Sequence, residues 1–383
     1  MKKKFYTVLG LMSGTSMDGI DVSIINSDGN SEYTTILDKY FEYNNDLYEQ
    51  LVNLRSKVTS KKNLKTYAKE LKSTEREITL FNANIVSKIL NESKIDIDFI
   101  GFHGQTIFHD TENKITKQLG DGMLLSSLTK EIVIYNFRQN DLNNGGQGAP
   151  LTPIFHNLIA NKINKKYKIG FPISILNIGG ISNITNTVSE KKLSYNQICA
   201  HDIGPGNCLI DDWIRKNSKK KYDKNGLIAK SGNTNKLILN QAMENFNIES
   251  YNKSLDINDF DISFAKGLSL EDGASTITDY TSSLIAKGIK YTNSINSLLT
   301  IKCLVCGGGR KNQYLIDGIK KNKTYLKKIS LEPIEKYGID GDFVESQAFG
   351  FLAIRTFLDL PISFPKTTRC KKPSTGGVIV KNF

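Results

Sequence analysis

The stretch Gly10-Leu11-Met12-Ser13-Gly14-Thr15-Ser16-Met17-Asp18-Gly19-Ile20-Asp21 lies between two apolar runs, Tyr6–Met12 and Ile20–Ile25. This order predicts a strand, a tight loop rich in glycine and hydroxyl residues, and a second strand. Successive amide groups in such a loop can surround phosphate oxygens, and Asp18 or Asp21 could face a metal ion through water. The chain has neither a Walker A motif nor a dinucleotide-binding glycine fingerprint. Taken alone, the stretch could also be an ordinary hairpin.

The length of 383 residues predicts two domains, because one hydrophobic core rarely supports a chain of this size. With 39% hydrophobic residues, there is enough apolar material for two cores. The net charge of +12 would suit a nucleic-acid partner, but lysine far outnumbers arginine and is scattered along the chain. We see no RNA-binding motif, and we expect no nucleic-acid partner.

The first residues, Met1-Lys2-Lys3-Lys4 before an apolar run, are similar to a signal peptide, but the run is short and no small-residue cleavage site follows. No apolar run is long enough to span a membrane. Cys303 and Cys306 lie within an apolar strand pattern without a second pair, which favours buried thiols over a metal site. We therefore expect a cytoplasmic protein that does not bind membranes, and the sequence leaves a homodimer open.

A second hairpin pattern opens the other half of the chain. Pro172–Ile178 reads as a strand, Gly179-Gly180 as a turn and Ser182–Thr187 as a returning strand. The repeated pattern predicts two similar α/β domains that face each other. A last helix, from about residue 343 to 359, should bring the chain back to the first domain. The expected borders are 1–130 plus about 345–383 for the first domain and 131–344 for the second.

Polar side chains gather after two predicted strands of the first half. His103, Gln105 and Thr106 follow an apolar run and would suit a hydroxyl-rich ligand, or they could be a polar strand end. Arg138 and Asp141 follow the next apolar run. They could form an ordinary ion pair, or the arginine could grip an anionic group of a substrate.

Three motifs in the second half could carry chemistry. Asp202 precedes a Gly-Pro-Gly turn at a helix entrance, where it could be a general base or a simple helix cap. Gly307-Gly308-Gly309 stands between a strand and a helix, which lets a backbone lie against a nucleotide. Glu345 follows the acidic stretch 338–342 and is expected on the first turn of the last helix.

The order of these blocks resembles the actin-like, sugar-kinase and Hsp70 ATPase superfamily. More closely, the chain is similar to the anhydro-N-acetylmuramic acid kinase family, above all in Gly10–Asp21. The resemblance implies an α/β fold of two RNase H-like (actin-like ATPase) domains with an interdomain cleft. It also implies a reaction in which 1,6-anhydro-N-acetylmuramic acid, ATP and water give N-acetylmuramic acid 6-phosphate and ADP, in peptidoglycan recycling.

The resemblance also implies roles for single residues. Asp202 matches the family's catalytic aspartate, and Glu345 a supporting acid. The sugar-side candidates are His103, Gln105, Thr106, Arg138 and Asp141. ATP, with Mg²⁺ held through water by Asp18 or Asp21, would contact Gly14, Thr15, Ser16, Met17, Asp18, Gly19, Ile20, Asp21, Asn177, Gly179, Gly180, Gly204, Gly307, Gly308, Gly309 and Asn312.

One segment departs from the family pattern. Where the family commonly has a segment like Lys-Ser-Thr-Gly-Arg, this chain has Lys253-Ser254-Leu255-Asp256-Ile257 at the start of the segment Lys253–Phe260, so the glycine and arginine are missing. Two other functions stay open: a kinase of the same fold that acts on an intact hexose, and a non-catalytic actin-like ATP-binding module. Substrate competition assays would distinguish a hexose kinase from an anhydro-sugar kinase. ATP turnover that no sugar affects would indicate the non-catalytic module.

Overall fold

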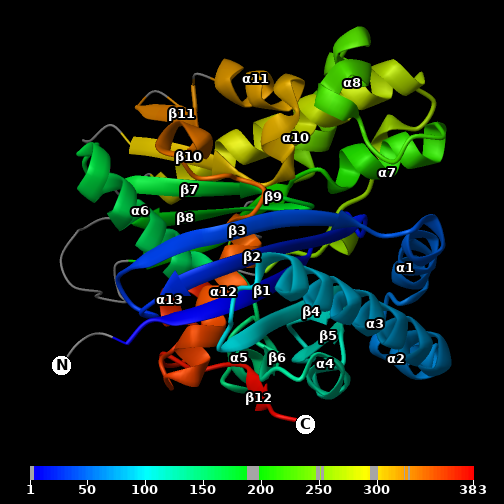
Figure 1. The fold of residues 1–383 in the computed structure, drawn as a ribbon. Helices are drawn as coiled ribbons and strands as arrows, with labels where there is room; N and C mark the ends of the chain where they lie inside the picture. Colours follow the sequence, from blue (N-terminus) through cyan, green and yellow to red (C-terminus); the bar gives the residue numbers. More distant parts are fainter. Residues whose placement is uncertain are drawn as a thin grey trace. The chain divides into compact units, whose positions relative to one another are not determined.

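The first hairpin forms as the sequence predicts. In this computed structural model, which describes residues 4–187, 198–246, 251, 254–293, 301–322, 324–326 and 328–383, β1 (Tyr6–Ser13) pairs antiparallel with β2 (Gly19–Ser27). The chain divides into two compact units: unit 1 comprises Met1–Lys162 and Phe343–Phe383, and unit 2 comprises Ile163–Asp342. Figure 1 shows one mixed α/β architecture in each unit.

Unit 1 is built on a sheet with the strand order β12-β6-β4-β1-β2-β3, and β5 pairs with β4 outside this path. β1, β2 and β3 form an antiparallel meander, while β4 runs parallel to both β1 and β6. The remaining strands of this sheet are β3 (Tyr33–Glu42), β4 (Phe99–Asp110), β5 (Ile115–Leu119), β6 (Val133–Tyr135) and β12 (Val378–Val380).

Unit 2 repeats this arrangement with the order β11-β10-β7-β8-β9. Again three strands form an antiparallel meander, and the first of them, β7, runs parallel to β10, which runs parallel to β11. Both sheets therefore have RNase H-like topology, and the predicted fold class is confirmed. The strands are β7 (Ile173–Ile178), β8 (Ile181–Thr187), β9 (Ile198–Pro205), β10 (Ile301–Cys306) and β11 (Ile329–Pro333).

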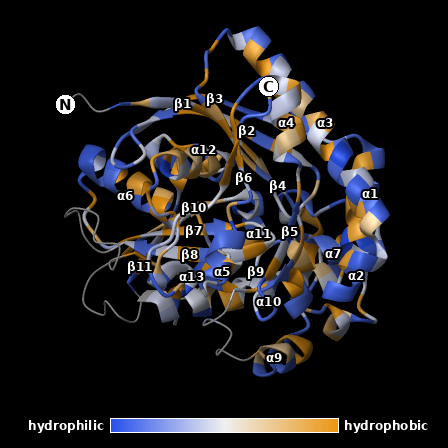
Figure 2. Cartoon of the chain, turned by 90° about the horizontal axis from the view of Figure 1, so that it is seen from below, coloured by the Kyte–Doolittle hydropathy of each residue, from blue (hydrophilic) through white to orange (hydrophobic). Residues whose placement is uncertain are grey.

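Helices cover both faces of the unit 1 sheet. α1 and α3 bury apolar side chains such as Leu51 and Ile78 against Leu9 and Leu11 of β1, and α12 packs on the opposite face. In Figure 2 hydrophobic colour follows the central strands and α12, while α2 is mainly hydrophilic. The helices are α1 (Asn45–Lys57), α2 (Lys61–Thr66), α3 (Ala68–Ser93), α4 (Gly122–Thr129), α5 (Gln139–Asn143), α12 (Val344–Phe357) and α13 (Pro365–Thr368), and α6 (Pro153–Tyr167) leads into unit 2.

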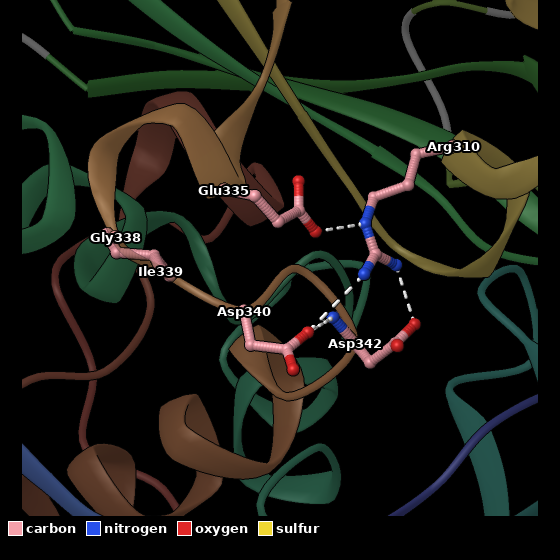
Figure 3. A pocket seen from close by; sticks show the side chains of 6 residues that line it. All are labelled: Arg310, Glu335, Gly338, Ile339, Asp340 and Asp342. Carbon is pink, nitrogen blue, oxygen red and sulfur yellow. Dashed lines mark hydrogen bonds and ion pairs between the residues drawn. The ribbon is translucent and has the colours of Figure 1, made fainter.

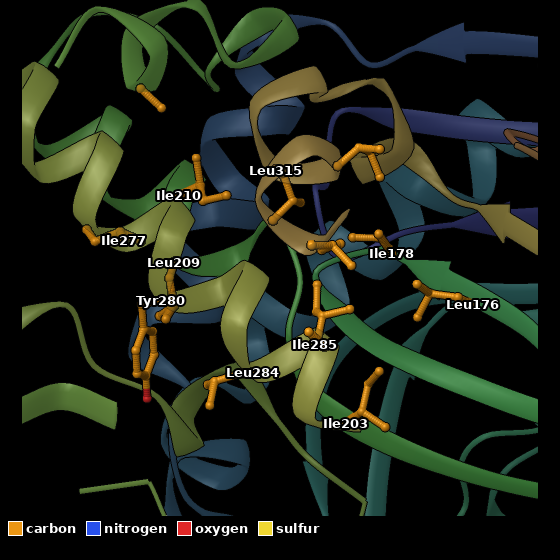
Figure 4. Close-up of a cluster of buried hydrophobic side chains, with 14 of the residues drawn as sticks. Leu176, Ile178, Ile203, Leu209, Ile210, Ile277, Tyr280, Leu284, Ile285 and Leu315 are labelled. Carbon is orange, nitrogen blue, oxygen red and sulfur yellow. The ribbon is translucent and has the colours of Figure 1, made fainter. Parts of the chain in front are cut away.

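The core of unit 2 lies under its longest helix, α10 (Figure 4). Trp213 of α7 packs on Gly273, where a Cβ atom would lie 2.1 Å from the indole, and its Nε1 donates to the Leu270 carbonyl. The α-helices are α7 (Cys208–Asn217), α8 (Leu227–Ser231), α9 (Lys236–Glu244), α10 (Leu270–Asn293) and α11 (Gln313–Lys321). The 3-10 turns are η2 (Lys224–Gly226), η4 (Ile257–Asp259), η5 (Ser263–Ala265), η7 (Gly308–Lys311) and η8 (Ile334–Tyr337).

The structural units differ from the domain borders expected from the sequence. The expected border after residue 130 would assign β6 to the second domain, but β6 pairs with β4 and β12 of the unit 1 sheet. Residues 131–162 therefore belong to unit 1, and the chain returns to it at Phe343. Over the residues described here, no helix is long and apolar enough to cross a membrane.

Glycines in two neighbouring strands let α12 lie directly on the sheet. Gly10 of β1 and Gly101 of β4 are register partners. A Cβ atom on Gly10 would lie 2.0 Å from the Ser346 carbonyl oxygen, and one on Gly101 would lie 2.4 Å from that of Phe349. Any side chain at either position would therefore push the helix backbone away from the strands.

We predict that Gly101→Ala lowers the free energy of unfolding by about 1–3 kcal/mol, because the methyl group overlaps helix backbone that cannot rotate aside. Urea unfolding followed by circular dichroism measures the loss. Gly14→Ala is the matched control, since a Cβ atom there meets only Ser16 Oγ, at 3.7 Å. Equal unfolding midpoints for the two variants would contradict the close contact between α12 and the sheet.

Candidate functional site

The loop of the first hairpin is exposed at its tip and anchored at its base. Thr15 and Ser16 are exposed, and Ser16 Oγ donates to Asp18 Oδ1 over 2.5 Å. Met17 is buried and has a left-handed backbone, with φ of 59°. The geometry leaves a short hydroxyl-rich loop, Gly14–Asp18, at the end of β1, where a phosphate-binding loop was predicted.

The last residues of the predicted phosphate loop belong to β2. Ile20 is buried in the core of unit 1, with 1% of its surface exposed. Gly19 packs against β3, where a Cβ atom would lie 2.3 Å from the Phe41 carbonyl oxygen. Asp21 pairs with Tyr40 and Met12 in the sheet. The strand packing accounts for Gly19 and Ile20, and it places the backbone of Asp21 in β2.

Gln105, a predicted sugar-side residue, holds the first hairpin loop. Its side chain is fully buried, and its Oε1 accepts a hydrogen bond from Ser13 Oγ over 2.6 Å. Its Nε2 donates to the Gly14 carbonyl over 2.9 Å. Ser13 Oγ also lies 3.0 Å from the hydroxyl of Tyr43, which directly follows β3, so the loop base is fixed from β4 and from the end of β3. Gln105 is placed as a brace for the loop.

Buried His103 and half-buried Arg138 form a hydrogen-bonded pair. His103 Nδ1 donates to the Gly104 carbonyl, and Nε2 accepts from Arg138 Nε and Nη2 over 3.1 and 2.9 Å. Burial, and then the neighbouring guanidinium, lower the pKa of His103 well below its usual value. The imidazole is therefore neutral at pH 7. Arg138 Nη1 donates to the Gly148 carbonyl, which ties the pair to the loop after α5.

Asp141 is built into the same loop. It is 1% exposed, and its Oδ2 accepts from the Gly148 amide while Oδ1 accepts from Thr368 Oγ1, both over 2.7 Å. Thr106, the last sugar-side candidate, is half-buried and accepts a hydrogen bond from Gln118 Nε2. The sugar-side candidates of unit 1 thus lie on β4 and in the segment that follows β6. β4 and β6 are neighbouring parallel strands.

The turn of the second hairpin is locked to the start of α7. The amides of Gly206 and Cys208 donate to the Gly180 carbonyl, and the Asn207 amide donates to that of Gly179 over 2.8 Å. A Cβ atom on Gly206 would lie 2.1 Å from the Gly179 oxygen, so only glycine fits there. Two sequence motifs therefore form one rigid unit at this end of the unit 2 sheet.

Asp202 lies within β9, opposite Asn183 of β8, and not in the Gly-Pro-Gly turn that follows. The expectation that the turn presents this residue is corrected, because the strand pairing continues to Pro205. Asp202 is 6% exposed, and its Oδ2 accepts from Ser254 Oγ and from the Leu255 amide, each over 2.9 Å. Gly204, the first glycine of the Gly-Pro-Gly stretch, has φ of 148° and packs toward Leu284.

The three glycines lie next to the second hairpin. β7 and β10 are parallel neighbours, so their carboxyl ends meet at one edge of the sheet. Gly307 follows β10 with φ of 81°, and a Cβ atom there would lie 2.3 Å from Asn177 Oδ1. Asn312 caps α11 by accepting from the Leu315 amide over 3.0 Å. The predicted ligand role of Asn312 stays a prediction beside this capping role.

A cavity of about 360 Å³ in unit 2 is lined by Arg310, Glu335, Gly338, Ile339, Asp340 and Asp342 (Figure 3). The guanidinium of Arg310, which directly follows the three glycines, donates to Glu335, Asp342 and the Gly307 carbonyl. Burial raises the pKa of Asp342, but hydrogen bonds from Arg310 and Lys311 more than offset it and hold the pKa below its ordinary value. Sequence reasoning did not single out Arg310, although its place after three glycines is a signal.

Cys303 and Cys306 occupy buried positions on β10. Residues three apart in a strand point to opposite faces of the sheet, so the two thiols cannot share one ion in this conformation. Cys303 belongs to the apolar core of unit 2, and burial raises the pKa of its thiol to about 12.

Glu345 lies on the first turn of α12, as expected, and is half-buried. The next residue, Ser346, contacts Ser23 of β2 through their hydroxyl oxygens, 2.7 Å apart. The helix that carries Glu345 is therefore fixed on the unit 1 sheet. In unit 2, the structure brings together Asn177, Gly307 and the Gly179–Asn207 contact, with Asp202 on the same sheet.

Two sheets of the same RNase H-like topology define the actin-like class of folds. The family model described as anhydro-N-acetylmuramic acid kinase matches residues 6–382. A protein of that name from Pelagibacter ubique (strain HTCC1062) is 54% identical over 385 residues, covering 100% of both chains. Another, from Agrobacterium fabrum, is 36% identical over 380 residues and covers 98% of each. The chain belongs to the anhydro-N-acetylmuramic acid kinase family.

Solved structures match the chain at much lower similarity. A ROK family glucokinase from Streptomyces griseus, in complex with glucose and AMPPNP, is 10% identical with a TM-score of 0.40. The match covers 90% of this chain and 98% of that one. The fold assignment stands on the strand order and direction described above.

We predict that Gln105→Ala loosens the first hairpin loop, because Ser13 Oγ and the Gly14 carbonyl lose a buried partner. Hydrogen exchange of peptides covering residues 12–18 should become about tenfold faster. Gln118→Ala is the matched control, since that glutamine bonds to threonine hydroxyls of β4 and β5 and not to the loop. Unchanged exchange in Gln105→Ala would remove it as a brace.

Proposed function

We propose that this protein is an ATP-dependent kinase that phosphorylates 1,6-anhydro-N-acetylmuramic acid while water opens the anhydro ring. The products are N-acetylmuramic acid 6-phosphate and ADP, and the reaction serves peptidoglycan recycling in the cytoplasm. The observation that carries this proposal is the family match over residues 6–382, together with relatives of that name at up to 54% identity among those compared. The position of the Asp202 carboxylate on strand β9 also supports this proposal.

ATP contacts are proposed for each unit separately. In unit 1, the exposed hydroxyls of Thr15 and Ser16 and the backbone of Gly14–Asp18 bind phosphate oxygens. In unit 2, the turn Gly179–Gly180 with Asn177 binds phosphate, and Gly307–Gly309 lies against the nucleoside. Gly204, also proposed to contact ATP, lies near the carboxyl end of β9 in the same sheet.

Mg²⁺ fits this chain as an ion shared with the nucleotide. Within the described ranges, no group of three or more His, Cys, Asp or Glu side chains could hold a metal. Mg²⁺ commonly keeps several waters and binds to substrate phosphates together with one or two carboxylates. Asp18 and Asp21 could supply these carboxylates. When bound, the ion neutralises charge on the phosphates.

Asp202 is the proposed general base. It takes a proton from a water whose oxygen forms a bond to C1 of the sugar. The C1–O6 bond breaks, and its electron pair stays on O6. O6 then attacks the γ-phosphorus, and the bond to the β-phosphate breaks to release ADP. Glu345 is proposed as a supporting acid.

The sugar is proposed to contact the β4 side of unit 1. His103 is neutral and oriented by Gly104, and Arg138 is held by His103 and Gly148, so both present fixed geometry. Arg138 would recognise the lactyl carboxylate of the sugar, since a guanidinium matches a carboxylate in charge and shape. The other sugar-side candidates, Gln105, Asp141 and Thr106, are proposed to stabilise the same part of unit 1.

We predict that Asp202→Asn lowers kcat by about 10²–10⁴-fold, because the amide keeps the shape but cannot accept a proton. ATP affinity should stay within about threefold of wild type by calorimetric titration. The product is followed by mass spectrometry after incubation with ATP, Mg²⁺ and anhydro-N-acetylmuramic acid.

Wild-type protein should form the 6-phosphate in this assay and leave an intact hexose, such as glucose, unphosphorylated. Phosphorylation of the hexose alone would instead indicate another sugar kinase of this fold. An Asp202→Asn variant within threefold of the wild-type rate would move the base to another residue, with Glu345 tested next.

A further inference from the structure

The carboxylate of Asp202 is held by a segment far away in the sequence. Its Oδ2 accepts one hydrogen bond from Ser254 Oγ and one from the Leu255 amide, both over 2.9 Å. Asp202 is 6% exposed, Ser254 8% and Leu255 7%. These contacts are shielded from water, so they hold the side chain more firmly than the same contacts on the surface would.

The residues after Leu255 form a turn that stabilises itself. Asp256 accepts from the Asn258 amide over 3.0 Å, and the Asp256 amide donates to Asp259 Oδ2 over 2.8 Å, which completes a capping box around η4. Phe260, which follows, packs against the apolar core of unit 2. The turn is therefore anchored at its far end, and it fixes the place of the two donors before it.

This segment is the one that departs from the family pattern. Lys253 lies outside the described residues, and the family's glycine and arginine are replaced. One of the two donors to Asp202 is a backbone amide, which any residue at position 255 other than proline supplies. The other is the hydroxyl of Ser254, which this chain keeps. The contact with Asp202 therefore needs neither the missing glycine nor the missing arginine.

We propose that Ser254 and the Leu255 amide are positioning groups that fix the carboxylate of Asp202 for proton transfer. This inference rests on the proposed function, in which Asp202 is the general base. A base must lie within hydrogen-bond distance of its proton and in line with it, and a free carboxylate turns about its side-chain bonds. Two donors on one oxygen set the plane of the carboxylate and stabilise its charge.

Kinetics of Ser254 variants test the positioning role. Ser254→Ala should lower kcat by about 10- to 100-fold and change KM for either substrate by less than about threefold, because the base is displaced but the binding surfaces remain. Ser254→Thr keeps a hydroxyl and should restore kcat to within about threefold of wild type.

Ser174→Ala is the matched control, since Ser174 is also buried in unit 2 and donates to the side chain of Asn186 over 3.2 Å. It should lose comparable stability and keep kcat. A Ser254→Ala variant with kcat equal to that of Ser174→Ala, or a threonine variant that rescues nothing, would overturn the positioning role.

Hydrogen exchange tests the contact without relying on catalysis. In Asp202→Ala the Leu255 amide loses its acceptor, so peptides covering residues 254–260 should exchange at least about tenfold faster, while peptides covering α10 stay unchanged. Unchanged exchange at 254–260 would overturn the contact itself. If wild-type protein makes no sugar 6-phosphate, the proposed function fails, and this exchange measurement still decides whether the segment holds Asp202.

Discussion

The close approach of α12 to the sheet at Gly10 and Gly101 is the constraint on which unit 1 depends. The helix backbone lies where two Cβ atoms would otherwise stand, so β1 and β4 are held in register beneath it. The first hairpin loop continues directly from β1, and Glu345 lies one residue before a contact of this helix with β2. This packing contact therefore fixes the positions of both the first hairpin loop and Glu345 in unit 1.

Buried polar side chains then fix the loops that no sheet hydrogen bond reaches. Gln105 holds the first loop in unit 1, and Asp141 holds the segment that ends at Gly148. In unit 2, the side chain of Asp202 on β9 holds the segment at Ser254 and Leu255. Each of these groups is less than a tenth exposed, and an unpaired buried polar group is costly, so the loops have few alternative conformations.

The hairpins, the repeated architecture and the place of Glu345 on a helix could be predicted, because they depend on local alternation, turn residues and helix spacing. The role of Gln105 could not be predicted, since a glutamine that follows an apolar run looks the same in the sequence whether it faces a ligand or a loop. Asp141 contacts Thr368, 227 residues away, and no local pattern contains that pairing. The domain border was misplaced for the same reason, because β6 joins the unit 1 sheet through strands distant in sequence.

In the proposed reaction, Asp202 directs water to the anomeric carbon while O6 takes the phosphate. The most direct measurement is the reaction in ¹⁸O-labelled water, with the product trapped in the first turnovers and analysed by mass spectrometry. Unlabelled N-acetylmuramic acid 6-phosphate, incubated alone, corrects for exchange at C1 through the open-chain sugar. The account predicts one labelled oxygen on C1 and none in the phosphate. A labelled phosphate, or no early label on C1, would contradict it.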